Sequence, residues 1–128
     1  MKHDQLADMF STIKNAEAIG RKQCVVPNSR LIRDALRVMH ENKYIGKTEV
    51  IEDGRGGKIK IEMLGRINDC GIIKPNFSVK MDEFIKYEKR YLPARDVGIL
   101  IVTTSKGVMD QHSALKKRTG GRLLGFVF

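Results

Sequence analysis

Cysteine, proline and aromatic residues are scarce in this sequence, which has two cysteines, three prolines and no tryptophan. Cys24 and Cys70 lie far apart, and neither has a second cysteine or a patterned histidine near it in the chain. This spacing supports neither a zinc site nor a disulfide framework. We therefore expect buried thiols in a reducing compartment and no bound metal.

Long apolar runs are also missing. The longest, Val97–Val102, contains Gly98 and is far shorter than the roughly 20 residues that a helix needs to span a bilayer. The N-terminal segment MKHDQLADMF lacks the apolar core of a signal peptide. We therefore expect a soluble, intracellular protein with no membrane partner.

Catalytic motifs are absent as well. The sequence contains no HExxH, CxxC, GxSxG or GxGxxG pattern, and its three histidines are scattered. The glycine-rich segment Gly54–Gly57 is not followed by the Gly-Lys-Ser/Thr that opens a helix in a phosphate-binding loop. Ser105 and Lys106 are adjacent, but neighbours in sequence seldom face each other across a reacting atom. These absences predict no catalytic residues, no cofactor and no small-molecule substrate.

Positive charge, by contrast, is abundant. The 128 residues include 24 Lys and Arg against 15 Asp and Glu, which gives a formal charge of +9. Such a balance favours a polyanionic partner, either nucleic acid or an acidic membrane face, although charge alone also fits a merely soluble basic protein. The densest segment is Gly98–Phe128, which contains the acid Asp110 and the bases Lys106, Lys116, Lys117, Arg118 and Arg122.

Apolar periodicity predicts an α+β protein whose N-terminal unit, residues 1–66, has the order α-β-α-β-β. The first helix is capped by Asp4 and ended by Gly20. A short strand follows, then a second helix capped by Asn28 or Ser29, and two strands joined by a glycine-rich hairpin complete the unit. After the first helix, these elements are expected at Gln23–Pro27, Arg30–Glu41, Lys47–Glu52 and Lys58–Leu64.

Residues 67–128 are expected to form a smaller, mainly-β unit with short helices, packed against the first unit. The turn-rich segment 65–68 marks the boundary. The strands are expected at Ile72–Lys74, Val79–Met81, Val97–Thr103 and Leu123–Phe128. The helices are expected at Asp82–Tyr91 and from the cap Asp110 to Arg118.

A polar turn after the most apolar strand is the best candidate binding site. Its hydroxyls suit a sugar 2′-hydroxyl or a base edge, and the basic residues around it suit phosphates, a combination that favours RNA. Alternatively, its threonines are ordinary strand residues and Lys116–Arg118 only balance a helix dipole. A basic DNA-binding or chromatin protein and a small phosphate-handling enzyme also stay open. The turn comprises Thr103, Thr104, Ser105, Lys106 and Gly107.

Four segments of the chain resemble one protein family. They are ADMFSTIKNA at Ala7–Ala16, VPNSRLI at Val26–Ile32, TTSKGVM at Thr103–Met109 and GGRLLGFVF at Gly120–Phe128. Together they are similar to ribosomal protein eight of the small subunit over nearly the whole chain. The hairpin around DGRGGKIKIEMLGRIN and the stretch YLPARDVGILIVTTSKG look like the archaeal and eukaryotic branch of that family.

The resemblance implies a structural, non-enzymatic constituent of the small subunit on the cytoplasmic ribosome. It implies a primary ribosomal-RNA-binding protein that docks on a helix of the central domain, supports assembly and translation, and has neighbouring ribosomal proteins as partners. The main RNA contacts implied are Thr104, Ser105, Lys106, Gly107, Gly120 and Gly121. The secondary contacts implied are Ser29, Arg30, Asp8, Asn15 and Lys74.

Two further residues complete the expected interface. Thr103 begins the polar turn, and Arg122 stands where bacterial relatives have an acidic residue, so its guanidinium can reach a phosphate. In the expected docking, the glycines let the backbone approach a distorted RNA minor groove. Ser105 and Thr104 hydrogen-bond to bases or 2′-hydroxyls there, while the basic side chains hold phosphates on either side.

Overall fold

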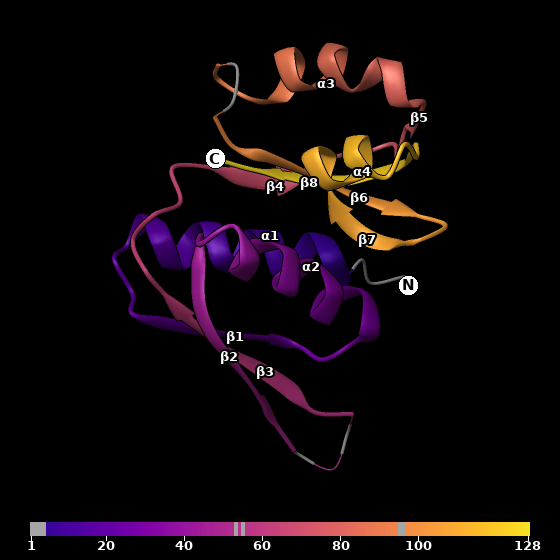
Figure 1. The fold of residues 1–128 in the computed structure, drawn as a ribbon. Coiled ribbons are helices and arrows are strands. Elements are labelled where there is room, and N and C mark those ends of the chain that lie inside the picture. Colours follow the sequence, from indigo (N-terminus) through magenta and orange to yellow (C-terminus); the bar gives the residue numbers. More distant parts are fainter. Residues whose placement is uncertain (1–4, 53, 55, 95–96) are drawn as a thin grey trace. The chain divides into compact units, whose positions relative to one another are not determined.

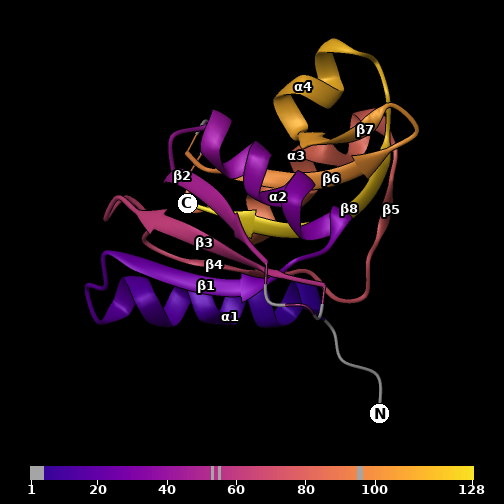
Figure 2. The same cartoon turned by 90° about the horizontal axis from the view of Figure 1, so that it is seen from below.

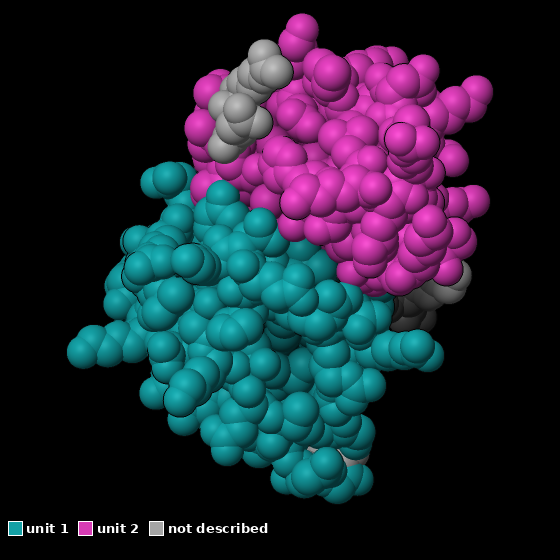
Figure 3. Space-filling view, viewed as in Figure 1, with its two compact units in different colours: residues 1–69 teal, residues 70–128 magenta. Residues whose placement is uncertain are grey.

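A computed structural model describes residues 5–52, 54, 56–94 and 97–128 (Figures 1 and 2). Helices and antiparallel sheets are both present, so the expected α+β class is confirmed. The chain divides into two compact units, residues 1–69 and 70–128 (Figure 3). Within the described ranges, no helix combines the length and the hydropathy that crossing a bilayer requires.

The first unit is a three-stranded antiparallel sheet with two helices over one face (Figure 1). The strand order is β1-β3-β2, so β1 and β2 are edges. The expected α-β-α-β-β order is confirmed, with β2 starting earlier than expected, while the cap expected at Asp4 lies outside the described residues. The elements are α1 (Gln5–Ala18), β1 (Gln23–Pro27), α2 (Arg30–Glu41), β2 (Ile45–Ile51) and β3 (Lys58–Met63).

Apolar periodicity explains this arrangement. In β3 the side chains alternate between exposed and buried, because helices cover one face of the sheet and the other face is open to solvent. Ser29 is the cap of α2, since its hydroxyl accepts a hydrogen bond from the Ile32 N–H at 3.2 Å. The apolar residues of α1, at three- and four-residue spacing, are all buried: Leu6, Met9, Phe10, Ile13 and Ala16.

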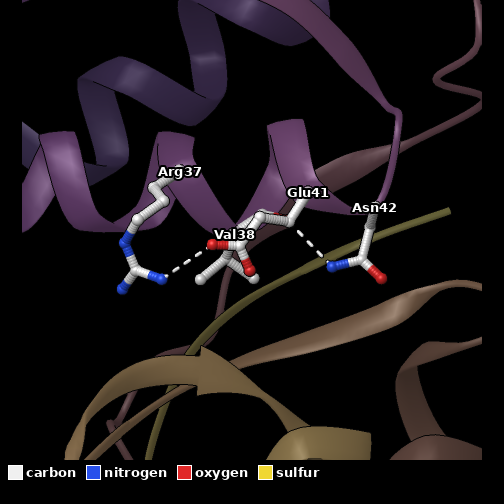
Figure 4. A network of polar contacts seen from close by, with 4 residues as sticks. All are labelled: Arg37, Val38, Glu41 and Asn42. Carbon is white, nitrogen blue, oxygen red and sulfur yellow. Dashed lines mark hydrogen bonds and ion pairs between the residues drawn. The ribbon is translucent and has the colours of Figure 1, made fainter.

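Both helices of this unit end with a residue in the left-handed backbone conformation. Gly20 takes this position after α1, at φ +71°, and glycine adopts it without steric cost. After α2 the position belongs to Lys43, at φ +65°, although a residue with a Cβ is disfavoured there. The preceding residue, Asn42, holds the turn through its side-chain amide, which donates to the Val38 carbonyl at 2.8 Å (Figure 4).

The second unit is a five-stranded antiparallel sheet built around β8. This strand pairs with β6 on one side and with both β4 and β5 on the other, in the order β4-β8-β6-β7. Two helices, α3 and α4, contribute Phe84, Tyr87 and Ala114 to a core that includes Leu100 and Leu123. The elements are β4 (Cys70–Ile72), β5 (Ser78–Val79), the 3-10 helix η1 (Met81–Glu83), α3 (Phe84–Tyr91), β6 (Ile99–Thr104), β7 (Gly107–Asp110), α4 (Gln111–Lys116) and β8 (Gly121–Val127).

Several strands and helices of this unit begin or end at residues other than the expected ones. The sequence does not predict β7, because a four-residue strand that begins with glycine is too short to show an alternation. β8 begins at Gly121 and not at Leu123, so the second glycine is the first residue of the strand. β4 and β5 begin earlier than expected, and the first turn of the expected helix Asp82–Tyr91 is the separate helix η1.

Two buried polar side chains hold α4 against the β6–β7 hairpin. Asp110 is the cap expected from the sequence, and its Oδ1 accepts a hydrogen bond from the Ser113 N–H at 2.7 Å. Gln111 is 1% exposed, and its Oε1 accepts a hydrogen bond from the Leu100 N–H at 2.7 Å. Since β7 pairs with β6 only as far as Asp110 and Ile101, the Gln111 side chain continues the ladder by one residue.

The bond between Gln111 and Leu100 predicts a loss of stability in Gln111→Leu. This change keeps a side chain of similar size but leaves the Leu100 N–H buried without an acceptor, which costs about 1–3 kcal/mol. Urea unfolding followed by circular dichroism measures the free energy of unfolding. The control is Gln5→Leu at an exposed position of α1, where the change stays within about 0.5 kcal/mol. Equal losses in the two variants would contradict the role given to Gln111.

Candidate nucleic-acid interface

The expected polar turn is the loop of a tight β-hairpin. β6 and β7 pair as far as Thr104 and Gly107, so only Ser105 and Lys106 form the loop. The Thr104 hydroxyl donates to the Gly107 carbonyl at 2.8 Å and accepts from the Lys106 N–H at 3.0 Å. Thr103 and Thr104 are therefore strand residues, and the hydroxyl proton of Thr104 is committed to holding the turn.

Ser105 carries the hydroxyl that the hairpin leaves available. Its side chain is exposed, and no other residue in the described ranges hydrogen-bonds to it. Gly107 has φ +114°, and a Cβ on it would meet nothing within 4 Å, so the space beside the turn is open. A ligand that approaches this tip meets one free hydroxyl, which can both donate and accept a hydrogen bond.

Lys106 connects the hairpin to the end of α4. Its ammonium donates to the Lys117 carbonyl at 3.0 Å. Lys117 closes α4, and a cation at the carbonyl end of a helix is favourable. The ammonium therefore has a partner within the protein, which holds it beside the basic end of α4.

α4 ends on an arginine at a position where glycine is usual. The Thr119 N–H donates to the Ala114 carbonyl at 3.0 Å and the Arg118 N–H to the Leu115 carbonyl at 3.1 Å, which are the paired bonds of a Schellman motif. Arg118 has φ +52°, a conformation that costs a residue with a Cβ roughly 1 kcal/mol. Because glycine is the usual sequence signal for this position, the sequence indicates only the charge of Arg118, as one of the basic residues suited to phosphates, and not its backbone conformation.

The basic side chains at this helix end lack acidic partners. Lys116, Lys117 and Arg118 are exposed, and none of them forms an ion pair with a residue that the structure describes. Asp110 accepts the capping bond at the opposite end of α4. Uncompensated positive charge therefore lies next to the Lys106 ammonium and the hairpin.

Packing within the protein explains why positions 120 and 121 are both glycine. A Cβ on Gly120 would collide with the Val79 carbonyl of β5, and a Cβ on Gly121 would collide with the Thr103 carbonyl of β6. Both neighbours are backbone groups, which cannot move aside as the end of a flexible side chain can. The two glycines allow β5, β8 and β6 to approach closely, and this packing alone requires them.

Arg122 and Thr103 lie on the sheet face opposite that of Val102 and Leu123, a face that also carries the buried side chains of Ile101 and Val108. Arg122 and Thr103 are direct partners in the β6–β8 register. The next pair along, Val102 and Leu123, belongs to the core, so the alternation of a strand places Arg122 and Thr103 on the other face. The same alternation places Thr104 on the face of Val102. Two expected contacts that are neighbours in sequence, Thr103 and Thr104, are therefore directed to opposite faces.

The remaining expected contacts lie on other elements. Lys74 is exposed in the connection between β4 and β5 of the second unit. Asp8 and Asn15 are exposed on α1, while Ser29 and Arg30 lie at the N-terminus of α2, all in the first unit. The expected residues are thus divided between the two units. In the part of the chain that the structure describes, no three His, Cys, Asp or Glu side chains are grouped to hold a metal ion.

Two small units, a tight hairpin and unpaired cations define a basic α+β protein with a surface suited to polyanions. Residues 4–128 match the family described as ribosomal protein S8. The chain is 52% identical over 129 residues to the small ribosomal subunit protein uS8 of Archaeoglobus fulgidus, with 100% of both chains covered. It is 50% identical over 126 residues to that of Methanococcoides burtonii, with 98% of this chain and 97% of the relative covered. The chain belongs to the ribosomal protein S8 family.

Family membership establishes the general function. The family is a structural, non-enzymatic component of the small ribosomal subunit, so the chain is a structural constituent of that subunit on the cytoplasmic ribosome. The resemblance stated from the sequence is confirmed, and so is the expectation that the protein is not an enzyme. The phosphate-handling enzyme centred on Ser105 is thereby excluded.

The left-handed residues at two helix ends predict a gain in stability. Arg118→Gly removes the Cβ strain at the end of α4, so the free energy of unfolding rises by about 0.5–1 kcal/mol. Lys43→Gly, at the equivalent position of α2, is expected to give a similar gain. Urea unfolding measures both changes. A loss of stability in either variant would show that its side chain makes a compensating contact.

Proposed function

We propose that the chain is a primary binder of small-subunit ribosomal RNA, which docks on a helix of the central domain and supports subunit assembly. The unit expected to bind RNA, residues 67–128, contains the hairpin, the basic end of α4 and the glycine pair. Lys74 adds an exposed side chain with a positive charge to the same unit. Neighbouring ribosomal proteins are the other partners in this proposal.

The observation that carries the proposal is the unpaired Ser105 hydroxyl at the tip of a fixed hairpin. Thr104 closes the turn with two hydrogen bonds, so the position of Ser105 is set before RNA arrives and little conformational entropy is lost on binding. The open space beside Gly107 lets a nucleotide approach the backbone. A hydroxyl in such a place can recognise a base edge or a 2′-hydroxyl.

In this proposal the positive charges contribute most of the affinity for RNA, and the Ser105 hydroxyl contributes the specificity for a particular RNA site. Lys116, Lys117 and Arg118 provide cations at the end of α4, and Arg122 provides one on the other face of the sheet. Phosphates on two sides of the hairpin can therefore be neutralised. An ammonium has three donors, so Lys106 retains two for a phosphate after its bond to the Lys117 carbonyl.

The first unit supplies secondary contacts. The Ser29 oxygen accepts the capping bond from Ile32, which leaves the hydroxyl proton for an RNA acceptor. Arg30 lies in the first turn of α2, where its own charge and the helix dipole both favour a phosphate. Asp8 and Asn15 are exposed on α1 and offer acceptors to 2′-hydroxyls.

Ser105→Ala tests the recognition step. Removing the hydroxyl is expected to weaken binding to a central-domain RNA fragment by about 1–2 kcal/mol. The slope of log affinity against log salt should not change, because no charge is lost. Binding titrations at several salt concentrations measure both quantities.

The control for this change is Thr48→Val, which removes an exposed hydroxyl from the edge of β2 and should leave RNA affinity unchanged. Duplex DNA serves as a competitor at the same salt concentration and should compete poorly. If Ser105→Ala binds RNA as tightly as the parent chain, or if duplex DNA competes equally well, the proposed recognition is wrong.

Arg122→Ala and Arg118→Gly test the charge contribution. Each removes one cation, so the salt slope is expected to fall by roughly one unit in each variant. Lys43→Gly is the matched control for Arg118→Gly, because it makes the same backbone change in the other unit and should leave the slope unchanged. Unchanged slopes in both arginine variants would contradict the phosphate contacts.

A further inference from the structure

β1 is an edge strand with one side unpaired. In the order β1-β3-β2, it pairs with β3 and with no other strand of the described chain. In an antiparallel pair, the peptide groups of successive residues point alternately toward the partner strand and away from it. About half of the peptide groups of β1 therefore point away from the sheet.

Two observed hydrogen bonds fix the phase of this alternation. The Met63 N–H donates to the Lys22 carbonyl at 2.8 Å, and the Asn28 N–H donates to the Gly57 carbonyl at 3.3 Å. Both bonds continue the β1–β3 register beyond the strand ends. The even-numbered residues of the segment 22–28 therefore direct their peptide groups to β3.

The odd-numbered residues Gln23 and Val25 consequently direct their N–H and C=O groups to the open edge. No bond from these groups to another described residue is observed. Pro27 is the next residue with the same orientation, and it has no N–H to donate. The unpaired edge is therefore short and ends at a proline, as edge strands commonly do.

A groove of about 550 Å³ lies between this edge and α1, which runs along β1 in Figure 2. Thr12 and Ile19 contribute to it from α1 and the turn that follows, while Gln23 and Val25 contribute from β1. Ile19 is 69% exposed and Val25 is 46% exposed, so apolar surface lies next to the unpaired peptide groups. An extended peptide binds this combination when it adds to a sheet as a strand.

The charge of the groove comes from Arg21, the charged member of its described lining. Burial raises the pKa of the Cys24 thiol, and the nearby Arg21 guanidinium lowers that pKa in part. Cys24 is therefore a neutral thiol at pH 7, which leaves the guanidinium without a negative partner among the lining residues. A carboxylate on an incoming segment would complement Arg21.

We propose that an extended, acidic segment of another small-subunit protein adds to β1 as a fourth strand, with one apolar side chain beside Ile19 on the helix-covered face and another beside Val25 on the open face. A second copy of this chain is disfavoured, because each copy carries a formal charge of +9. RNA is disfavoured, because the groove offers peptide groups and apolar side chains but a single cation. The proposal depends on membership of the subunit and is independent of how RNA is bound.

Val25→Pro removes an N–H that the added strand needs. The sheet loses no bond, because this N–H points away from β3. Val50→Pro is the matched control on β2: Val50 is also 46% exposed, and it pairs with Ile59, whose peptide groups face Val26 of β1. The Val50 N–H therefore points away from β3 at the opposite edge of the same sheet.

The experiment uses purified small subunits assembled with chains in which Ile19→p-benzoylphenylalanine provides a photo-crosslinker. We expect an adduct to a peptide of another protein that contains acidic residues. The yield of the adduct should be about tenfold lower with Val25→Pro than with Val50→Pro, because the loss of one or two hydrogen bonds weakens binding by about that factor. Without any substitution, the Gln23 and Val25 amides should exchange hydrogen about tenfold more slowly in subunits than in the isolated chain.

An adduct to RNA, an adduct to a second copy, or equal yields from the two proline variants would overturn the proposal. Unchanged amide exchange of Gln23 and Val25 on assembly would also overturn it, and this measurement needs no variant that must fold. The isolated Val25→Pro chain should bind the central-domain RNA fragment with unchanged affinity. Failure of the peptide site is thereby distinguished from failure of the RNA interface.

Discussion

The close approach of β5, β8 and β6 is the constraint on which the second unit depends. β8 enters the sheet between the other two strands at Gly120 and Gly121, where a Cβ on either residue would collide with backbone. This entry fixes the path of the chain from the end of α4, and the Lys117 carbonyl at that end receives the Lys106 ammonium. A hairpin tip, a helix end and a strand start are thus brought together by one packing requirement.

Neighbouring polar residues have different roles because the hairpin must be closed. Thr104 uses its hydroxyl proton within the turn, whereas Ser105 has its hydroxyl free. Likewise, Lys106 is held by a carbonyl of the protein, whereas Lys116 has no ion-pair partner among the described residues. The side chains that bond within the protein fix the positions of the neighbouring side chains that can bind a partner. Because these positions are fixed beforehand, less conformational entropy is lost on binding.

Elements with consistent local signals could be predicted from the sequence. β1 and α2 have the limits expected from their apolar spacing, cap and proline. β4 and β7 could not be placed correctly, since the register with β8 and β6 decides where such short strands begin. In the site, residue types indicated hydroxyls and charge, but the bond between Lys106 and Lys117 joins residues eleven apart and has no local signature.

The exposed groups that can bind a partner differ between the two units, so the two units suit chemically different partners. A chain that worked alone would gain stability from glycine in place of Arg118 and from covering the open edge of β1. A chain selected within an assembly can retain such features where a partner compensates for them. In the second unit the open groups are a hydroxyl and cations, which complement RNA. In the first unit, beside β1, they are peptide groups and apolar side chains, which complement an extended peptide. We infer that the two units offer the ribosome two chemically distinct contacts, one for each kind of polymer in the subunit.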